Sequence, residues 1–172
     1  RSVFENDEKK IRMNLDFKKI EKIAKERHNL HEGQSSHRPL LSKKTGLTAS
    51  PWYYEFVGLV GEFAFAEDFG VEVDQSLKVD GDGGKDFLQF SEVGKIDVKA
   101  AQIPNNLLVE EGHVRADVFV LYGFDINKET AWSVGWTYKE EVLAKAPQAW
   151  PQKVVNHIVP KFELNHINKL KQ

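Results

Sequence analysis

The sequence predicts a mixed α/β fold in which one β-sheet packs against helices. A long stretch with apolar residues at helical spacing lies between Ser50 and Gly70. A second, shorter helical stretch covers 139–144. The runs that we interpret as strands are 86–90, 95–100, 117–122 and 130–136. This order of elements indicates a single domain, with a short N-terminal strand and helix ahead of its core.

The composition is that of a globular protein. Hydrophobic residues make up 41% of the 172 residues and charged residues 29%, which supports one packed core and excludes a disordered chain. There is no cysteine, which excludes disulfides and thiolate metal ligands and fits a cytoplasmic location. No apolar run approaches the roughly 20 residues that span a bilayer, so we expect no membrane association. Residues 1–10 also lack the pattern of a signal peptide.

The first 49 residues are predicted to form an appendage and a polar arm ahead of a core in 50–172. Apolar and polar residues alternate from Ile11 to Phe17, which indicates a short strand. Asp16 can then cap a helix that begins near Phe17. Residues 28–49 are polar and rich in Gly, Ser, His and Lys, so we interpret them as a loop or arm.

The core is expected to begin with a long helix. Ser50 and Pro51 form a good helix start, a capping hydroxyl followed by a proline in the first turn. Gly70 can end the helix in a left-handed conformation. Glu62 lies inside the helix beside Gly61, and small neighbours of this kind allow a helix to approach the next element closely.

Two of the predicted strands form a hairpin. A glycine-rich turn at 80–84 precedes the strand 86–90, and a connection of hairpin length joins that strand to 95–100. On the second strand, period-two alternation puts Asp97 and Lys99 on one face, opposite the apolar residues. Taken alone, this pair is best interpreted as a solvent-exposed ion pair, which contributes little to stability.

The remaining strands are more apolar. Residues 117–122 read as a central strand buried on both faces. Trp132 and Trp136 are expected to share one face of the next strand and to lie in the core. The tail is expected to form an edge strand near Ile158, with Pro160 limiting its pairing.

Acidic residues around the hairpin change the interpretation of the Asp97–Lys99 pair. Asp86 begins the first hairpin strand and Glu62 lies on the preceding helix, so these carboxylates can approach Asp97. Carboxylates that converge repel one another unless a cation joins them. Oxygen ligands at few positions suit Mg²⁺ or Mn²⁺, which can activate a water for attack on a phosphodiester. Asp117 could join such a site, although a cap at a strand end is the simpler interpretation.

This arrangement resembles the PD-(D/E)xK nuclease superfamily, which has a restriction-endonuclease-like fold. The resemblance rests on a helical glutamate, then Asp86, then Asp97-Val98-Lys99, and it runs from about Trp52 to about Trp136. The glycine-rich turn and the Gly-Trp pair before the short helix are similar to small phage and bacterial members. Lys85 stands where the family pattern has proline, and aspartate replaces glutamate at position 97, both of which the family tolerates.

The resemblance implies a role for each matched residue. Asp86, Asp97 and the Val98 carbonyl would ligate the metal, and Glu62 would ligate it directly or through water. Lys99 would position the attacking water. Gln102 matches a supporting glutamine that some members carry.

The function that the resemblance implies is Mg²⁺- or Mn²⁺-dependent hydrolysis of DNA, as an endonuclease in a cytoplasm, the host's if the chain is phage-encoded. Members of the fold often act as homodimers. Three alternatives stay open: a junction resolvase or an RNA nuclease of the same fold, an inactive nuclease-like protein that binds nucleic acid or a partner, and a plain interaction module.

Because the net charge of the chain is −2, phosphate binding would have to come from a local basic patch, from a metal ion, or from both. The polar arm can supply such a patch from His37, Arg38, Lys43 and Lys44. The alternative is a solvated loop whose charges contact nothing specific. The arm lacks the helical pair of histidines that is typical of a zinc site.

Overall fold

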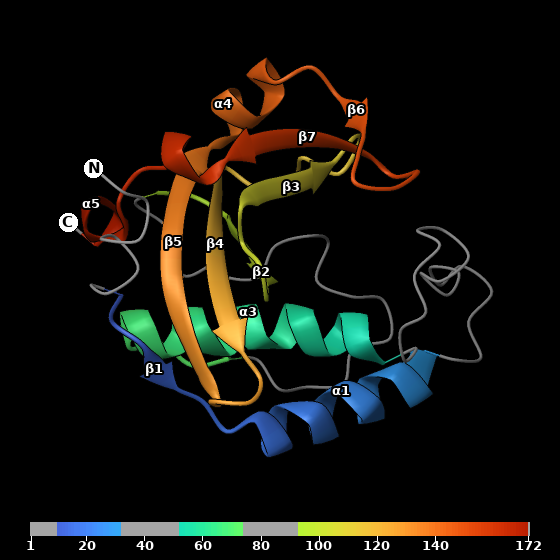
Figure 1. Cartoon of the computed structure of the whole chain (residues 1–172), viewed down its shortest axis with the longest axis vertical. Helices are drawn as coiled ribbons and strands as arrows, with labels where there is room; N and C mark the ends of the chain where they lie inside the picture. The colour runs from blue at the N-terminus through green and yellow to red at the C-terminus, as the bar shows by residue number, and fades with distance from the viewer. Residues whose placement is uncertain (1–9, 32–51, 74–92, 172) are drawn as a thin grey trace.

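Two β-sheets and two long helices dominate the part of the chain that the computed structural model describes, residues 10–31, 52–73 and 93–171 (Figure 1). The long helices are α1 (Phe17–His31) and α3 (Tyr53–Phe69). The expectation of a loop or arm from residue 28 is wrong for 28–31, because α1 continues for about one further turn there. They lie together toward one end of the molecule, and the smaller sheet lies toward the other (Figure 1). In the described ranges, no helix combines the length and the apolar character needed to cross a membrane.

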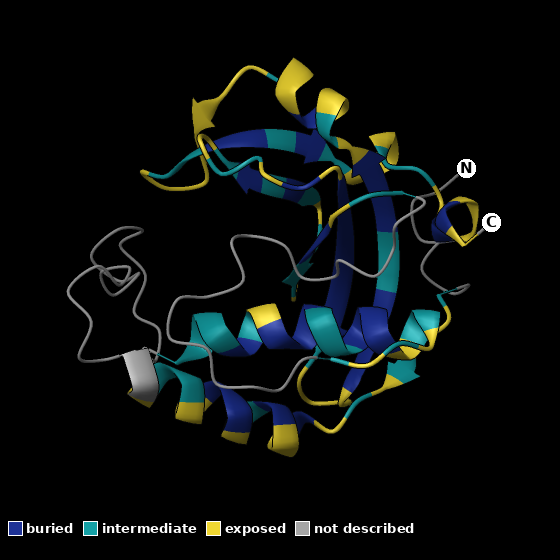
Figure 2. Cartoon of the chain, turned by 180° about the vertical axis from the view of Figure 1, so that it is seen from behind, coloured by how far each residue is buried: buried dark blue, intermediate teal, exposed yellow. Residues whose placement is uncertain are grey.

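The main sheet has four strands in the order β1-β5-β4-β2. The strands are β1 (Met13–Asn14), β2 (Ile96–Ala101), β4 (Val118–Asp125) and β5 (Thr130–Tyr138). β2 runs parallel to β4, and β4 runs antiparallel to β5. β4 is buried from Val118 to Phe124, which confirms the prediction of a central strand (Figure 2). The predicted N-terminal strand is present as β1, and it pairs with β5.

One face of the main sheet carries the larger core. Phe17 of α1, Phe56 of α3 and Phe124 of β4 form a cluster with ring centroids 5.9–6.3 Å apart. α3 crosses β2 closely at Gly61, where an added Cβ would lie 3.2 Å from the Val98 side chain. The small residue thus permits the close helix–strand approach that the sequence predicted.

The second sheet was not predicted. Its order is β3-β7-β6, with β3 (Asn106–Glu110), β6 (Gln148–Ala149) and β7 (Val155–Pro160). The expectation of one sheet is therefore wrong. The tail strand around Ile158 is the central strand of this sheet rather than an edge strand, because Pro160 is its last residue and interrupts no pairing within it. A smaller core lies between the two sheets and includes Leu107, Phe119 and Val159.

The two tryptophans of β5 lie on opposite faces of the main sheet, which corrects the prediction that they share one. Leu121 pairs with Gly135, whereas the next residue, Tyr122, pairs with Ser133. The extra residue in β5 makes a β-bulge, which reverses the alternation of side chains beyond it. Trp136 therefore lies in the helix-covered core, and Trp132 packs against Gly123 on the other face.

The ends of several elements agree with the sequence. Asp16 accepts a hydrogen bond from the Lys19 N–H at the start of α1 (3.1 Å), and Gly70 ends α3 with a left-handed φ of 66°. The short helix is present as α4 (Lys139–Ala144). Asp117 caps the start of β4, where its Oδ2 accepts a hydrogen bond from the Lys95 N–H (2.9 Å).

The last described elements are a 3-10 turn, Lys161–Glu163, and α5 (Ile167–Leu170). The predicted helix start at Ser50 and Pro51 and the hairpin strand 86–90 lie outside the described residues.

Candidate functional site at the edge of the main sheet

Asp97 and Lys99 lie on β2 with their side chains on the same face of the sheet. Ile96 and Val98 pack into the helix-covered core, so the residues that alternate with them face the opposite way. The Lys99 Nζ lies 3.1 Å from the Asp97 Oδ2. The predicted juxtaposition on one face is thus present in the structure.

The burial of the pair differs from that of a surface ion pair. The Asp97 side chain is only 10% exposed, whereas the Lys99 side chain is 39% exposed. Asp97 pairs across the sheet with Phe119, which belongs to the smaller core. A buried carboxylate is costly unless a cation or hydrogen-bond donors compensate it. Lys99 supplies one such charge, and its amino group remains accessible from solvent.

Glu62 lies between the two long helices. Its Oε2 is 3.8 Å from Nη1 of Arg27 in α1, and both side chains are 16% exposed. α3 covers the face of β2 that is opposite to Asp97. A metal ion shared by Glu62 and Asp97 would therefore have to bind at the outer edge of β2, where the two faces meet. Within the described sheet β2 is the edge strand, and its outer side lies away from β4.

The remaining predicted ligands are only partly described. Asp86 lies outside the described residues, as do His37, Arg38, Lys43 and Lys44 of the polar arm. The Val98 side chain is buried in the helix-covered core, and its carbonyl as a ligand stays a prediction. Among the described residues, no three His, Asp or Glu side chains converge on a metal-binding position. The expected carboxylate set includes Asp86, so that set also stays a prediction.

Gln102 lies just beyond the end of β2 and is exposed. Its Nε2 donates a hydrogen bond to the hydroxyl oxygen of Tyr53, at the start of α3. The structure therefore ties Gln102 to the helix that carries Glu62.

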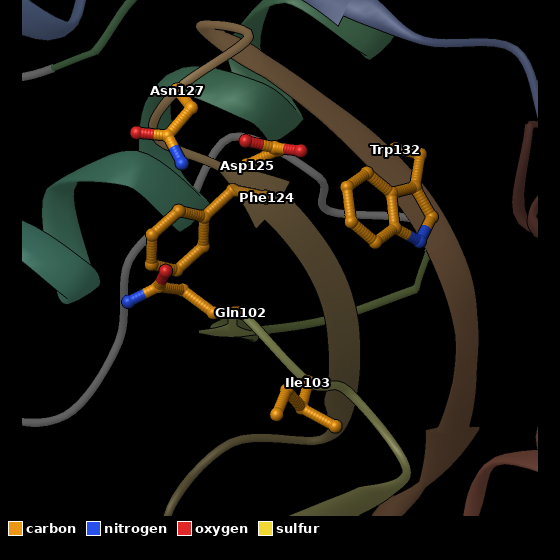
Figure 3. A pocket seen from close by; sticks show the side chains of 6 residues that line it. All are labelled: Gln102, Ile103, Phe124, Asp125, Asn127 and Trp132. Atoms are coloured by element: carbon orange, nitrogen blue, oxygen red, sulfur yellow. The ribbon is translucent and has the colours of Figure 1, made fainter.

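A pocket of about 420 Å³ lies next to this site and was not predicted (Figure 3). It is found where the parallel strands β2 and β4 end, a common position for ligand sites in sheets with parallel strands. The sequence feature that could have indicated this pocket is the presence of two polar residues, Asp125 and Asn127, at the end of the apolar strand β4. The lining residues are Gln102, Ile103, Phe124, Asp125, Asn127 and Trp132.

Comparisons of the chain with protein-family models, with curated proteins and with solved structures give no match. The structure shows a mixed α/β architecture with two sheets. We therefore argue function from the placement and chemistry of the residues around β2.

Proposed function

We propose that this protein is a nuclease that hydrolyses DNA phosphodiester bonds, with Mg²⁺ or Mn²⁺ bound at the outer edge of β2. The observation that carries the proposal is the buried carboxylate of Asp97, held 3.1 Å from the amino group of the partly exposed Lys99 side chain, on one face of the strand that forms the edge of the described sheet. The sequence places two further carboxylates, Asp86 and Glu62, in the elements that precede this strand.

The donor set suits a hard divalent cation. Asp97 offers a carboxylate oxygen in a partly apolar setting, where nearby positive charge, that of Lys99 and in the proposal also that of the ion, offsets the cost of burial. In the proposal Asp97, Asp86 and the Val98 carbonyl hold the ion, and Glu62 reaches it directly or through water. The ion, when bound, supplies a Lewis acid that polarises the phosphate and lowers the pKa of a water molecule.

Lys99 has two tasks in the proposed reaction. Its Nζ can orient the attacking water through a hydrogen bond, and its positive charge can stabilise the negative charge that develops on the phosphorane oxygens. Because the side chain is 39% exposed, the amino group can leave Asp97 and contact a phosphate without a change in the backbone. No residue of the chain forms a covalent intermediate in this scheme.

A purely structural ion pair is the competing explanation. Buried ion pairs are often no more stabilising than apolar residues of similar size, so stability alone gives little reason to bury Asp97 beside a core phenylalanine. An inactive binding protein, an RNA nuclease and a junction resolvase of the same architecture are the further candidates. A homodimer that cuts both DNA strands belongs to the same proposal. For each of these alternatives, Asp97 and Lys99 remain the residues to be tested.

The first experiment measures cleavage of plasmid and oligonucleotide DNA by the full chain in Mg²⁺ and in Mn²⁺. EDTA is expected to stop the cleavage. Asp97→Asn keeps the shape of the side chain but removes its charge, and Lys99→Met removes the amino group. We expect each substitution to lower the rate by about 100-fold or more, by analogy with the loss of a single transition-state contact.

The matched control is Lys145→Met. Lys145 is 37% exposed and forms an ion pair with Glu163, with its Nζ 2.8 Å from Oε2, so it resembles Lys99 in exposure and pairing. We expect this variant to cleave DNA at the wild-type rate. A wild-type chain that cuts neither DNA nor RNA in either metal would refute the proposed function. Full activity in Asp97→Asn would refute the site.

A further inference from the structure

The pocket beside the candidate active site lies where β2 and β4 end, and its Trp132 wall stands on the same face of the main sheet as Asp97 and Lys99. Ala101 follows Lys99 by two residues on β2 and pairs with Gly123 of β4, which in turn pairs with Trp132 of β5. A Cβ added at Gly123 would overlap the indole of Trp132, so this ring lies on the Lys99 face. Two residues of a parallel strand span about 6.6 Å. The pocket is therefore one row of side chains from Lys99.

The pocket combines hydrogen-bonding groups with a volume that can hold a nucleobase. Its 420 Å³ lies within the range of small-ligand sites. Gln102 and Asn127 bring carboxamides to the pocket (Figure 3). One N–H of Gln102 already donates to the Tyr53 hydroxyl, so its Oε1 is the atom that can accept from a base, whereas the Asn127 carboxamide can both donate and accept. These are the side chains that pair with adenine in nucleic-acid complexes.

Asp125 adds an acceptor to the pocket. Its Oδ1 accepts a hydrogen bond from the Lys128 N–H (3.1 Å), which closes the turn after β4. Among the described residues its Oδ2 has no partner, so it can accept a hydrogen bond from an exocyclic amino group. This acceptor favours adenine, cytosine or guanine over thymine or uracil, which have no such group.

Trp132 is an unsatisfied donor in the pocket wall. The residue is 7% exposed, and its Nε1–H is buried with no hydrogen-bond partner in the described part of the chain. Burying a donor in this way costs about 1–3 kcal/mol. Native structures satisfy most such groups, and because this nitrogen is itself closed to solvent, the part of Trp132 that a pocket occupant meets is its ring.

Positive charge lies directly over the same tryptophan. The Arg12 guanidinium carbon is 4.6 Å from the centre of the indole ring, and Lys10 Nζ is 5.0 Å from it. Arg12 Nη1 also donates to Thr130 Oγ1 (3.1 Å), which holds the guanidinium in place. These two cations are suited to the phosphate of a nucleotide whose base occupies the pocket.

An apolar side chain stands at the rim. Ile103 lines the pocket and is 77% exposed, in the connection between β2 and β3. Exposed aliphatic side chains of this kind are used by nucleic-acid-binding proteins as wedges that separate stacked bases. Beside a base-sized pocket, Ile103 is placed to keep an unstacked base from returning to its neighbours.

We infer that this pocket binds one unstacked nucleobase with an exocyclic amino group, in the strand whose phosphate is presented to Asp97 and Lys99. The inference rests on the proposed function for the phosphate site, but the contacts that define it are separate. Gln102, Asn127 and Asp125 contact the base, Lys10 and Arg12 its phosphate, and Ile103 the adjacent base. At one position near the cleaved bond, the protein would then prefer a base with an exocyclic amino group over thymine or uracil.

The test uses the full chain and a single-stranded oligonucleotide that contains one 2-aminopurine, a fluorescent base with an exocyclic amino group. Ca²⁺ replaces Mg²⁺ so that binding is measured without hydrolysis. We expect fluorescence to rise on binding, because the base leaves its stack. Unlabelled oligo(dA) should compete about tenfold better than oligo(dT), the factor that corresponds to about 1.4 kcal/mol of base discrimination.

The variants are Gln102→Ala, Asn127→Ala and Ile103→Ala, with Asn168→Ala as the control because Asn168 is an exposed carboxamide on α5. The first two should remove the preference for oligo(dA), and Ile103→Ala should reduce the rise in fluorescence. Asn168→Ala should change neither. A wild-type protein with equal competition by oligo(dA) and oligo(dT), or pocket variants that behave like Asn168→Ala, would overturn the inference.

Cleavage assays separate the two proposals. Cleavage in Mg²⁺ without base preference would overturn the base pocket and leave the nuclease standing. Saturable 2-aminopurine binding that Asn127→Ala abolishes, in a chain that never cleaves, would support the pocket and overturn the nuclease. Absence of both binding and cleavage would overturn both.

Discussion

At the scale of single residues, side-chain direction decides which groups can act together. Asp97 and Lys99 share a face because strand alternation requires it, and this was predictable from the sequence. The direction of Glu62 was not predictable, because it depends on how α3 packs on β2 and α1, and the structure places it against Arg27. Trp132 was placed wrongly for a similar reason, since one additional residue in β5 reverses its face.

The packing of Gly123 against Trp132, beside the pocket, can be tested at the scale of one residue. Gly123→Ala introduces a Cβ that overlaps the Trp132 indole, so we expect the free energy of unfolding in urea to fall by about 1–3 kcal/mol. Gly58→Ala is the control, because its Cβ would meet nothing within 4 Å on an exposed part of α3. That control should gain about 0.5–1 kcal/mol from helix propensity. Equal stability of the two variants would contradict the packing.

At the scale of elements, local signals predicted helices better than they predicted sheets. Asp16, Gly70 and the 139–144 pattern are short-range features, and α1, α3 and α4 follow them. β3 escaped prediction because its sheet pairs Leu107 with Val159, residues far apart in the chain. The same long-range pairing turned the expected edge strand at Ile158 into a central one.

The start of α4 provides a test of one such local signal. The Glu141 Oε2 accepts a hydrogen bond from the Tyr138 N–H (2.9 Å) and another from the Thr137 hydroxyl, which together form a capping arrangement. Glu141→Ala should lower the free energy of unfolding by about 1 kcal/mol. Glu140→Ala, in the same exposed first turn, should change it by less than about 0.5 kcal/mol. Thermal or urea unfolding of both variants measures the difference, and an effect as large in Glu140→Ala would contradict the cap.

At the scale of the whole molecule, one partly buried network joins three segments that are distant in the chain. The Tyr122 hydroxyl of β4 donates to Asp68 Oδ2 of α3 (2.8 Å). Lys171, just after α5, lies with its Nζ 2.6 Å from Asp68 Oδ1. Burial raises the pKa of Tyr122 far above its ordinary value, and the adjacent Asp68 carboxylate raises it further by charge repulsion and by accepting a hydrogen bond from the protonated hydroxyl.

This raised pKa makes stability sensitive to alkaline pH. An unfolded tyrosine loses its proton near pH 10, whereas folded Tyr122 keeps it, so the unfolded state binds fewer protons above that pH. The stabilisation is complete below about pH 10 and falls by up to about 1.4 kcal/mol per pH unit above it. Tyr122→Phe should remove this part of the slope, at a cost of about 1 kcal/mol at neutral pH. Urea unfolding of the wild type and of Tyr122→Phe between pH 8 and pH 11.5 measures how the free energy of unfolding changes with pH. Identical slopes for the two proteins would contradict the prediction.

The sequence by itself determined the mixed α/β class, the start of α1 and the end of α3, the buried strand β4 and the shared face of Asp97 and Lys99. These features depend on periodicity and on capping residues, which act over a few residues. Only the tertiary structure decided the second sheet, the opposite faces of Trp132 and Trp136, the contact of Glu62 with Arg27, and the pocket beside Lys99. Each of these depends on which distant segments pair and in which register, and a single inserted residue is enough to change the outcome.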